Sequence, residues 1–68
     1  MSRKSFSSRE VVRLLEGHGF KLVRVRGGHH VFEHPETRRH VTVPHPKKDL
    51  PLGTVMSIFR HAGIEPPG

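Results

Sequence analysis

The chain has 68 residues, a formal net charge of +6 and no cysteine; this length fits one domain, residues 1–68, with a small hydrophobic core and no disulfide to stabilise it. The sequence has neither an apolar run long enough to span a membrane nor the apolar segment of a secretory signal peptide, so we expect a cytoplasmic protein without a membrane anchor. Its positive charge favours a polyanionic partner, with nucleic acid as the first candidate and an acidic protein as the second.

The first expected element is a helix that begins after Ser7. Ser7 and Glu10 have the spacing of a capping box, in which each side chain accepts a hydrogen bond from the backbone N–H of the other residue. Phe6 and Val11 occupy the positions of a hydrophobic staple. Apolar residues then recur with helical spacing as far as Gly19, where glycine can adopt the left-handed conformation that ends many helices.

Three strands are expected after this helix. Residues 20–26 are rich in Phe, Leu and Val, and residues 29–34 form the returning strand of a hairpin. Between them, Gly27 and Gly28 fit a two-residue turn, where positive φ is required and glycine adopts it at little cost. A polar turn follows, and residues 40–43 alternate as a third short strand that prolines then end.

The two-residue turn also sets the register of the hairpin. Arg26 is expected opposite His29, and Arg24 opposite Val31. Apolar residues occur in both alternation phases of these strands, and we therefore expect the sheet face that the helices leave open to need a partner. One phase holds Phe20, Leu22 and Val31, and the other holds Val23, Val25 and Phe32.

A second helix is expected near the C-terminus. It follows a loop over residues 44–50 and starts near residues 49–51, with a proline early in the helix. Gly63 closes it, and residues 65–68 are expected to be disordered. Its apolar stripe consists of Val55, Ile58, Phe59 and Ala62. The predicted fold is therefore α+β, with the order α-β-β-β-α and two helices on one face of a three-stranded antiparallel sheet.

His29 is the candidate catalytic residue. RNA carries its own nucleophile, the 2′-hydroxyl, so cleavage needs a base for that hydroxyl, an acid for the leaving oxygen and positive charge on the phosphate. Histidine with arginine and lysine can supply all three without a metal. The glycines at 27 and 28 would let a phosphate approach closely. A histidine at a strand start is more often a surface or hydrogen-bonded residue, so spacing alone leaves the question open.

The seven histidines of the chain also raise the question of a metal site. His29 and His30 are adjacent on a strand and point to opposite faces, and Phe32 separates His30 from His34. The sequence has no HExxH motif, no Cys/His zinc spacing, no Gly-x-Ser-x-Gly nucleophile motif and no phosphate-binding glycine loop. We expect no metal and no other cofactor.

Three segments occur in order along nearly the whole chain: a Leu-Leu-x-x-x-Gly-Phe pattern from Leu14 to Phe20, GGHHVF at the hairpin turn, and VPHPKKDLPLGTVMSIFRHAGI after it. Together they resemble the HicA family of toxin mRNA interferases. The resemblance implies a dsRBD-like (double-stranded-RNA-binding-domain-like) α-β-β-β-α fold. It also implies a toxin of a type II toxin–antitoxin system that cleaves mRNA, inhibits translation and growth, and is neutralised by a HicB antitoxin.

The same resemblance assigns roles to residues. The usual turn motif of the family is Gly-Ser-His or Gly-Thr-His, and its histidine, regarded as essential for toxicity, corresponds to His29. This chain has Gly28 at the middle position, which removes a hydroxyl that could orient the histidine or touch a phosphate. His45 fits a second acid or base, or a phosphate contact. The expected RNA-binding residues are Arg24, Arg26, Gly27, Gly28, His45, Lys47 and Lys48.

Two other functions stay open at this point. The chain could be a non-catalytic RNA-binding module or an inactive toxin relic of the same fold, and then RNA binding would not depend on His29 beyond a modest change in affinity. It could instead bind only an acidic protein, which predicts no RNA affinity at low salt. RNA binding by a basic module should weaken steeply as salt rises.

Overall fold

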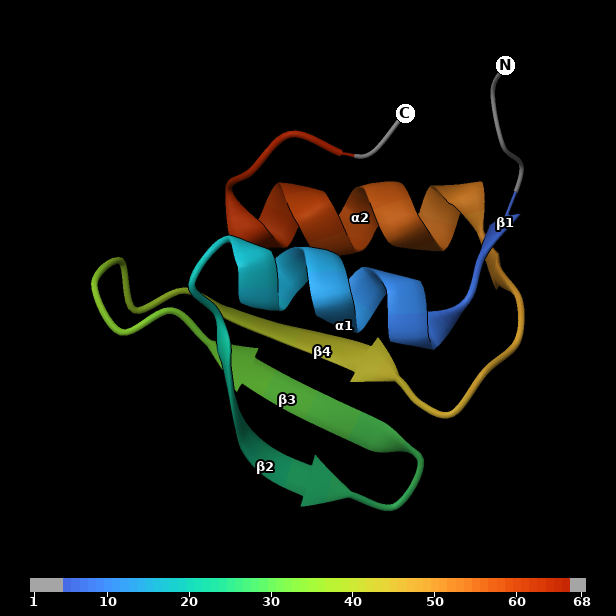
Figure 1. Cartoon of the computed structure of the whole chain (residues 1–68), viewed down its shortest axis with the longest axis horizontal. Coiled ribbons are helices and arrows are strands. Elements are labelled where there is room, and N and C mark those ends of the chain that lie inside the picture. Colours follow the sequence, from blue (N-terminus) through green and yellow to red (C-terminus); the bar gives the residue numbers. More distant parts are fainter. Residues whose placement is uncertain (1–4, 67–68) are drawn as a thin grey trace.

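The computed structural model describes residues 5–66, in which a helix is followed by an antiparallel sheet and a second helix (Figure 1). The predicted tail over residues 65–68 includes 67–68, which lie outside the described residues. The sheet has the strand order β2-β3-β4. In chain order, the helices and the strands of this sheet are α1 (Ser8–Gly17), β2 (Lys21–Arg26), β3 (His29–Glu33), β4 (His40–Pro44) and α2 (Leu52–Ala62). The α+β fold and the order α-β-β-β-α are confirmed.

A second, two-stranded sheet was not predicted. It pairs β1 (Ser5–Phe6) with β5 (Leu50–Pro51) in antiparallel register, with Phe6 opposite Leu50. The second helix begins at Leu52, one residue past the predicted region 49–51. The expectation of a proline inside the helix is wrong, because Pro51 is the N-cap residue and the strand pairing holds its backbone extended. Phe6 and Leu50 are both buried, so this pairing ties the start of α2 to the chain that enters α1.

The ends of α1 match the sequence prediction. The Ser7 Oγ accepts a hydrogen bond from the Glu10 N–H at 3.1 Å, and the Glu10 carboxylate accepts one from the Ser7 N–H at 3.0 Å, which completes the capping box. At the other end, Gly19 has a φ of 94°. The Phe20 N–H then donates to the Leu15 carbonyl at 3.0 Å, which is the long hydrogen bond of a Schellman motif.

Both helices cover the same face of the main sheet, the face that carries Phe32, Val41 and Val43. These side chains and the apolar stripes of the helices form one buried cluster. The predicted stripe of α2 is confirmed. No helix within residues 5–66 is long and apolar enough to cross a membrane. The core residues are Phe6, Val11, Leu15, Phe20, Phe32, Val41, Val43, Leu50, Val55, Ile58, Phe59 and Ala62.

The register of the hairpin agrees with the prediction near the turn and departs from it further away. Arg26 lies opposite His29 and Arg24 lies opposite Val31, as expected. A β-bulge then makes Val23 an extra residue, and Leu22 pairs with Phe32. Because cross-strand partners share a face, Leu22 lies on the helix side with the buried Phe32. The predicted grouping of Leu22 with Val31 is therefore wrong.

The open face of the sheet is polar and charged, so the apolar surface without cover lies elsewhere. The residues of this face, in cross-strand register, are Lys21, Arg24, Arg26, His29, Val31, Glu33, His40, Thr42 and Pro44. The most exposed of the large apolar side chains are on β2, the strand furthest from the helices in Figure 1. Leu22 and Val25 are 46% and 56% exposed although both stand on the helix side. The helices are too narrow a layer to reach them.

Because the helices bury Val43 but not Val25, replacing each by alanine should change the free energy of unfolding by different amounts. Val43 is fully buried and Val25 is 56% exposed, and both stand on the helix side of the same sheet. We expect Val43→Ala to lower the free energy of unfolding by about 2 kcal/mol, because it removes buried methyl groups and leaves a cavity. Val25→Ala should lower it by about 0.5 kcal/mol or less. Urea titration followed by circular dichroism measures both, and equal losses would contradict the described packing.

Candidate nucleic-acid interface

His29 is the first residue of β3 and directly follows the Gly27–Gly28 turn. It pairs with Arg26 on β2 and with Pro44 on β4, which places its exposed side chain on the open face of the sheet. His30 pairs with the buried Val43 and therefore points to the helix side. The prediction that His29 and His30 face opposite sides of the sheet is confirmed.

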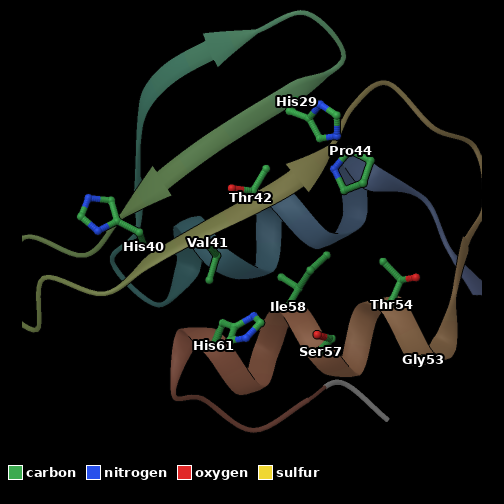
Figure 2. A pocket seen from close by; sticks show the side chains of 10 residues that line it. All are labelled: His29, His40, Val41, Thr42, Pro44, Gly53, Thr54, Ser57, Ile58 and His61. Atoms are coloured by element: carbon green, nitrogen blue, oxygen red, sulfur yellow. The ribbon is translucent and has the colours of Figure 1, made fainter.

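A groove of about 710 Å³ begins at His29 and follows the free edge of β4 along α2. Figure 2 shows His29 and Pro44 at one end, and His40 and His61 at the other. Between them, Thr42 comes from β4 and the other hydroxyls come from α2. We call this the β4–α2 groove, and it is lined by His29, His40, Val41, Thr42, Pro44, Gly53, Thr54, Ser57, Ile58 and His61.

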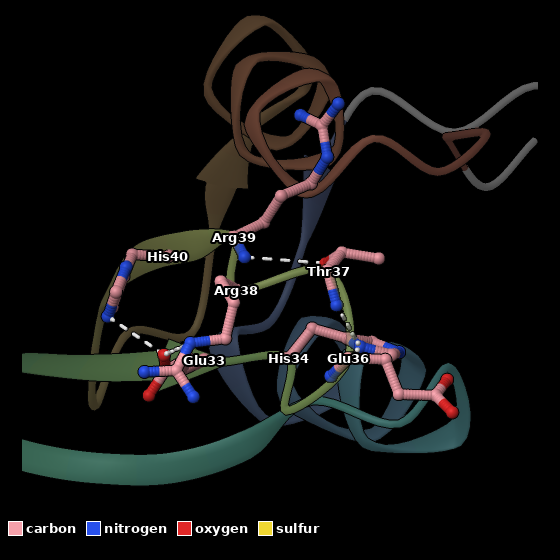
Figure 3. Close-up of polar contacts among 7 residues, drawn as sticks. All are labelled: Glu33, His34, Glu36, Thr37, Arg38, Arg39 and His40. Carbon is pink, nitrogen blue, oxygen red and sulfur yellow. Dashed lines mark hydrogen bonds and ion pairs between the residues drawn. The ribbon is translucent and has the colours of Figure 1, made fainter.

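The chemistry of the β4–α2 groove is that of neutral donors and acceptors with three imidazole rings. No acidic side chain lines it. The Glu33 carboxylate lies 3.6 Å from the Nε2 of His40, a residue of the groove, and 3.3 Å from the Arg38 Nε (Figure 3). His40 therefore has a carboxylate partner. Among residues 5–66, no carboxylate pairs with His29 or with Arg26, so the positive charge beside His29 is open to an anion.

The turn between β3 and β4, which follows Glu33, is held by its own hydrogen bonds. The His34 Nδ1 accepts from the backbone N–H groups of Glu36 and Thr37, at 3.1 and 3.3 Å (Figure 3). The Arg39 N–H donates to the Thr37 Oγ1 at 3.3 Å. The ring of His34 also packs edge-on against Phe20, with centroids 5.2 Å apart. His34 is therefore a structural residue of this turn.

Two adjacent glycines in the hairpin turn differ in conformation. Gly27 has a φ of 52°, in the left-handed region, while Gly28 has no positive φ. The expectation of positive φ thus holds for Gly27 and is wrong for Gly28. A Cβ added to either would meet no atom within 4 Å, so the surface around the turn is open. Each glycine therefore has free space on the side where a Cβ would lie.

His45 joins the loop after β4 to the hairpin turn. Its backbone N–H donates to the Gly28 carbonyl at 2.9 Å. Its ring lies on the helix side, where the Nδ1 is 2.6 Å from the Ser8 Oγ and the ring centroid is 4.5 Å from that of His30. His29 and His45 therefore line different grooves, although both adjoin the same turn.

The predicted arginines and lysines of the site also fall into two groups, one beside His29 and one beside His45. Arg24 and Arg26 stand on the open face with His29, and Lys47 and Lys48 lie beside His45. Sequence reasoning missed Ser8, His40 and the polar side of α2. For α2 a signal exists, because Thr54, Ser57 and His61 have the spacing of one helical face. Within residues 5–66, no three His, Cys, Asp or Glu side chains are arranged to hold a metal ion.

Comparison with known proteins gives one family. The model of the family described as "HicA toxin of bacterial toxin-antitoxin" matches residues 8–64 of the 68-residue chain. The matched segment runs from the first residue of α1 to the residue after the glycine that ends α2, and it includes both grooves almost entirely. No curated protein matches the chain.

The two glycines of the turn provide a matched test of its geometry. Gly27→Ala should lower the free energy of unfolding by about 1–2 kcal/mol, since an L-residue is strained at this left-handed φ. Gly28→Ala should leave it unchanged or raise it by up to about 1 kcal/mol, because alanine restricts the unfolded chain and its Cβ meets open space. Thermal unfolding of the two variants checks this, and a comparable loss at Gly28 would show that the turn has another conformation.

Proposed function

The chain belongs to the HicA toxin family of bacterial toxin–antitoxin systems, and from this premise we propose that it is an endoribonuclease that cleaves mRNA with His29 and without a metal. Cleavage inhibits translation and growth, and a HicB antitoxin binds the toxin and neutralises it. The family itself implies an antitoxin partner. The HicB identity of that partner and the mRNA substrate are part of the proposal.

The observation that carries this proposal is the environment of His29. The imidazole is exposed, it adjoins two residues without side chains, and its cross-strand neighbour on the open face is Arg26. The β4–α2 groove leads away from it with hydroxyls and imidazoles along its walls. A single RNA strand has phosphates, hydroxyls and base edges that such groups can bind.

The proposed reaction uses side chains of this chain and solvent water. The 2′-oxygen loses its proton and bonds to the adjacent phosphorus, while the bond from phosphorus to the 5′-oxygen breaks and that oxygen gains a proton. The products are a 2′,3′-cyclic phosphate and a 5′-hydroxyl. His29 takes the proton from the 2′-oxygen as base or gives one to the leaving 5′-oxygen as acid, and solvent water makes the other transfer. Arg26 offsets the negative charge on the phosphate. Arg24, one pair further along the same face, holds the strand by its phosphates.

His29→Ala provides the first test. It should reduce cleavage of a single-stranded RNA by about 10²–10⁴-fold, because a positioned acid or base contributes that much to the rate. It should also abolish growth arrest on induced expression. His18→Ala is the matched control, since His18 is exposed at the end of α1 and lines neither groove. Gel assays with purified protein and growth curves give the two readouts.

Other outcomes of this experiment identify the alternatives. Equal cleavage by the wild type and His29→Ala would assign the chemistry to another residue. RNA binding without cleavage by the wild type would favour a binding module or an inactive relic. Gly28→Ser then separates these two, because it restores the hydroxyl of the usual family motif at a position with space for a side chain. Cleavage gained by this variant would identify a relic.

The open-face arginines predict the salt dependence of RNA binding. Replacing both Arg24 and Arg26 by alanine should reduce the slope of log affinity against log salt concentration by about 1.4, since each phosphate contact of a single strand contributes about 0.7. Arg13→Ala combined with Arg60→Ala removes the same charge from exposed helix positions that line neither of these grooves and should leave the slope nearly unchanged. Fluorescence anisotropy with a labelled RNA at several salt concentrations measures the slopes. Equal slopes for both double variants would exclude the open face as the contact.

A further inference from the structure

A second groove, of about 670 Å³, adjoins the hairpin turn through His45, whose backbone N–H donates to the Gly28 carbonyl. Its walls come from the first turn of α1 and from the loop that follows β4. We call it the α1–loop groove. Its lining residues are Ser7, Ser8, Arg9, His45, Pro46, Lys47 and Lys48. None of them is acidic, and the side chains of three carry a permanent positive charge.

The loop is held against α1 by Ser8, which is only 1% exposed. The Ser8 N–H donates to the Lys47 carbonyl at 2.9 Å, and the Lys47 N–H donates to the Ser8 Oγ at 2.9 Å. The same Oγ lies 2.6 Å from the His45 Nδ1 and 3.1 Å from the Lys47 carbonyl oxygen. One buried hydroxyl thus fixes both the backbone of Lys47 and the ring of His45.

Hydrogen-bond accounting shows which nitrogen of His45 is left for a ligand. The hydroxyl has one proton, which it donates either to the His45 Nδ1 or to the Lys47 carbonyl. In the second case the His45 Nδ1–H donates to the Ser8 Oγ. The Nδ1 is occupied in both cases, and the Nε2 is the nitrogen that remains. The ring of His30 packs edge-on against His45 at 69°, which further restricts the ring.

The cations of this groove have no partner in the described part of the chain. Among residues 5–66, ion pairs join Glu33 to Arg38 and His40, and none involves Arg9, Lys47 or Lys48. Asp49 adjoins Lys48 in sequence, but its carboxylate accepts a hydrogen bond from the Ser5 hydroxyl at 3.3 Å. The side chains of Arg9, Lys47 and Lys48 are exposed and can therefore offset the charge of an anionic ligand.

We propose that the α1–loop groove binds a second phosphate of the RNA strand, one or more nucleotides beyond the bond that is cut at His29. His45 donates its Nε2–H to this phosphate, which selects the arrangement in which the Ser8 hydroxyl donates to the Nδ1 and the Nε2 carries the ring proton. Ser8 is the positioning residue that orients His45. The hydrogen bond from the His45 N–H to the Gly28 carbonyl joins the groove to the turn, so one strand can pass from His29 across the glycines into it. The substrate is therefore RNA that extends past the cut site.

This inference rests on the proposed function, and its test is designed to be read separately. RNA with 2′-O-methyl groups throughout has no free nucleophile and cannot be cut, so its binding is measured on the wild-type protein whether or not the protein is an enzyme. The probes are a fluorescently labelled 2′-O-methyl dinucleotide and an octanucleotide. Cleavage of ordinary RNA is assayed in parallel, and its absence would count only against the proposed function.

Lys47→Ala combined with Lys48→Ala should weaken binding of the octanucleotide about tenfold and leave the dinucleotide nearly unchanged. Arg13→Ala combined with Arg60→Ala is the matched control for charge and should change octanucleotide binding less than threefold. If both double variants weaken the octanucleotide equally, only general charge is involved and the proposal fails. Unchanged binding by the Lys47/Lys48 variant overturns it as well, and would leave an acidic protein as the ligand class for this groove.

The role of Ser8 has a spectroscopic readout. In nitrogen-15 spectra of the imidazoles, addition of the octanucleotide should shift the His45 Nε2 and leave Nδ1 nearly unchanged. In Ser8→Ala both nitrogens should respond, because the hydroxyl no longer holds Nδ1. A wild-type Nε2 that does not respond would exclude His45 as a phosphate ligand. The Lys47/Lys48 double variant changes exposed side chains only, so it tests the groove even if Ser8→Ala does not fold.

Discussion

The pairing of β3 with both of its neighbours is the constraint on which the candidate interface depends. Side chains alternate along a strand, so a slip of one residue would exchange the two faces. Phe32 resists such a slip, because it is buried to 1% exposure and would have to enter water. The free energy of burying this one ring therefore also keeps His29, three residues earlier, on the open face. Stability and the placement of the proposed catalytic side chain are not separable here.

The hairpin turn is the point at which three segments distant in sequence meet. His45 is tied to it through the Gly28 carbonyl, and Ser8 ties His45 to α1. The groups of the α1–loop groove thus come from a loop and the first turn of a helix, whereas the β4–α2 groove is lined from within a strand and a helix. The buried Ser8 hydroxyl stabilises this junction by its hydrogen bonds to the loop. In the described part of the chain, no buried side-chain nitrogen or oxygen lacks a hydrogen bond.

The features that the sequence predicts well are those with a strong local signal. The capping box, the apolar stripe of α2 and the pairing of Arg26 with His29 depend on residues close together in the chain. The bulge at Val23 gives no such signal, because one extra residue in a short apolar strand leaves the composition unchanged. The two-residue strands β1 and β5 are too short for any periodicity. The grooves were not predictable either, because they form only when the helices pack on the sheet and join residues that are distant in the sequence.

The uncovered edge at β2 has a consequence for the behaviour of the free chain in solution. An edge strand with exposed apolar side chains is a template on which other copies can add. The bulge at Val23 disturbs this template, and Lys21, Arg24 and Arg26 give it a positive charge that repels an identical strand. That repulsion is screened as ionic strength rises. The colloidal stability of the isolated protein is therefore greatest at low salt, and self-association through this edge becomes easier as salt is added.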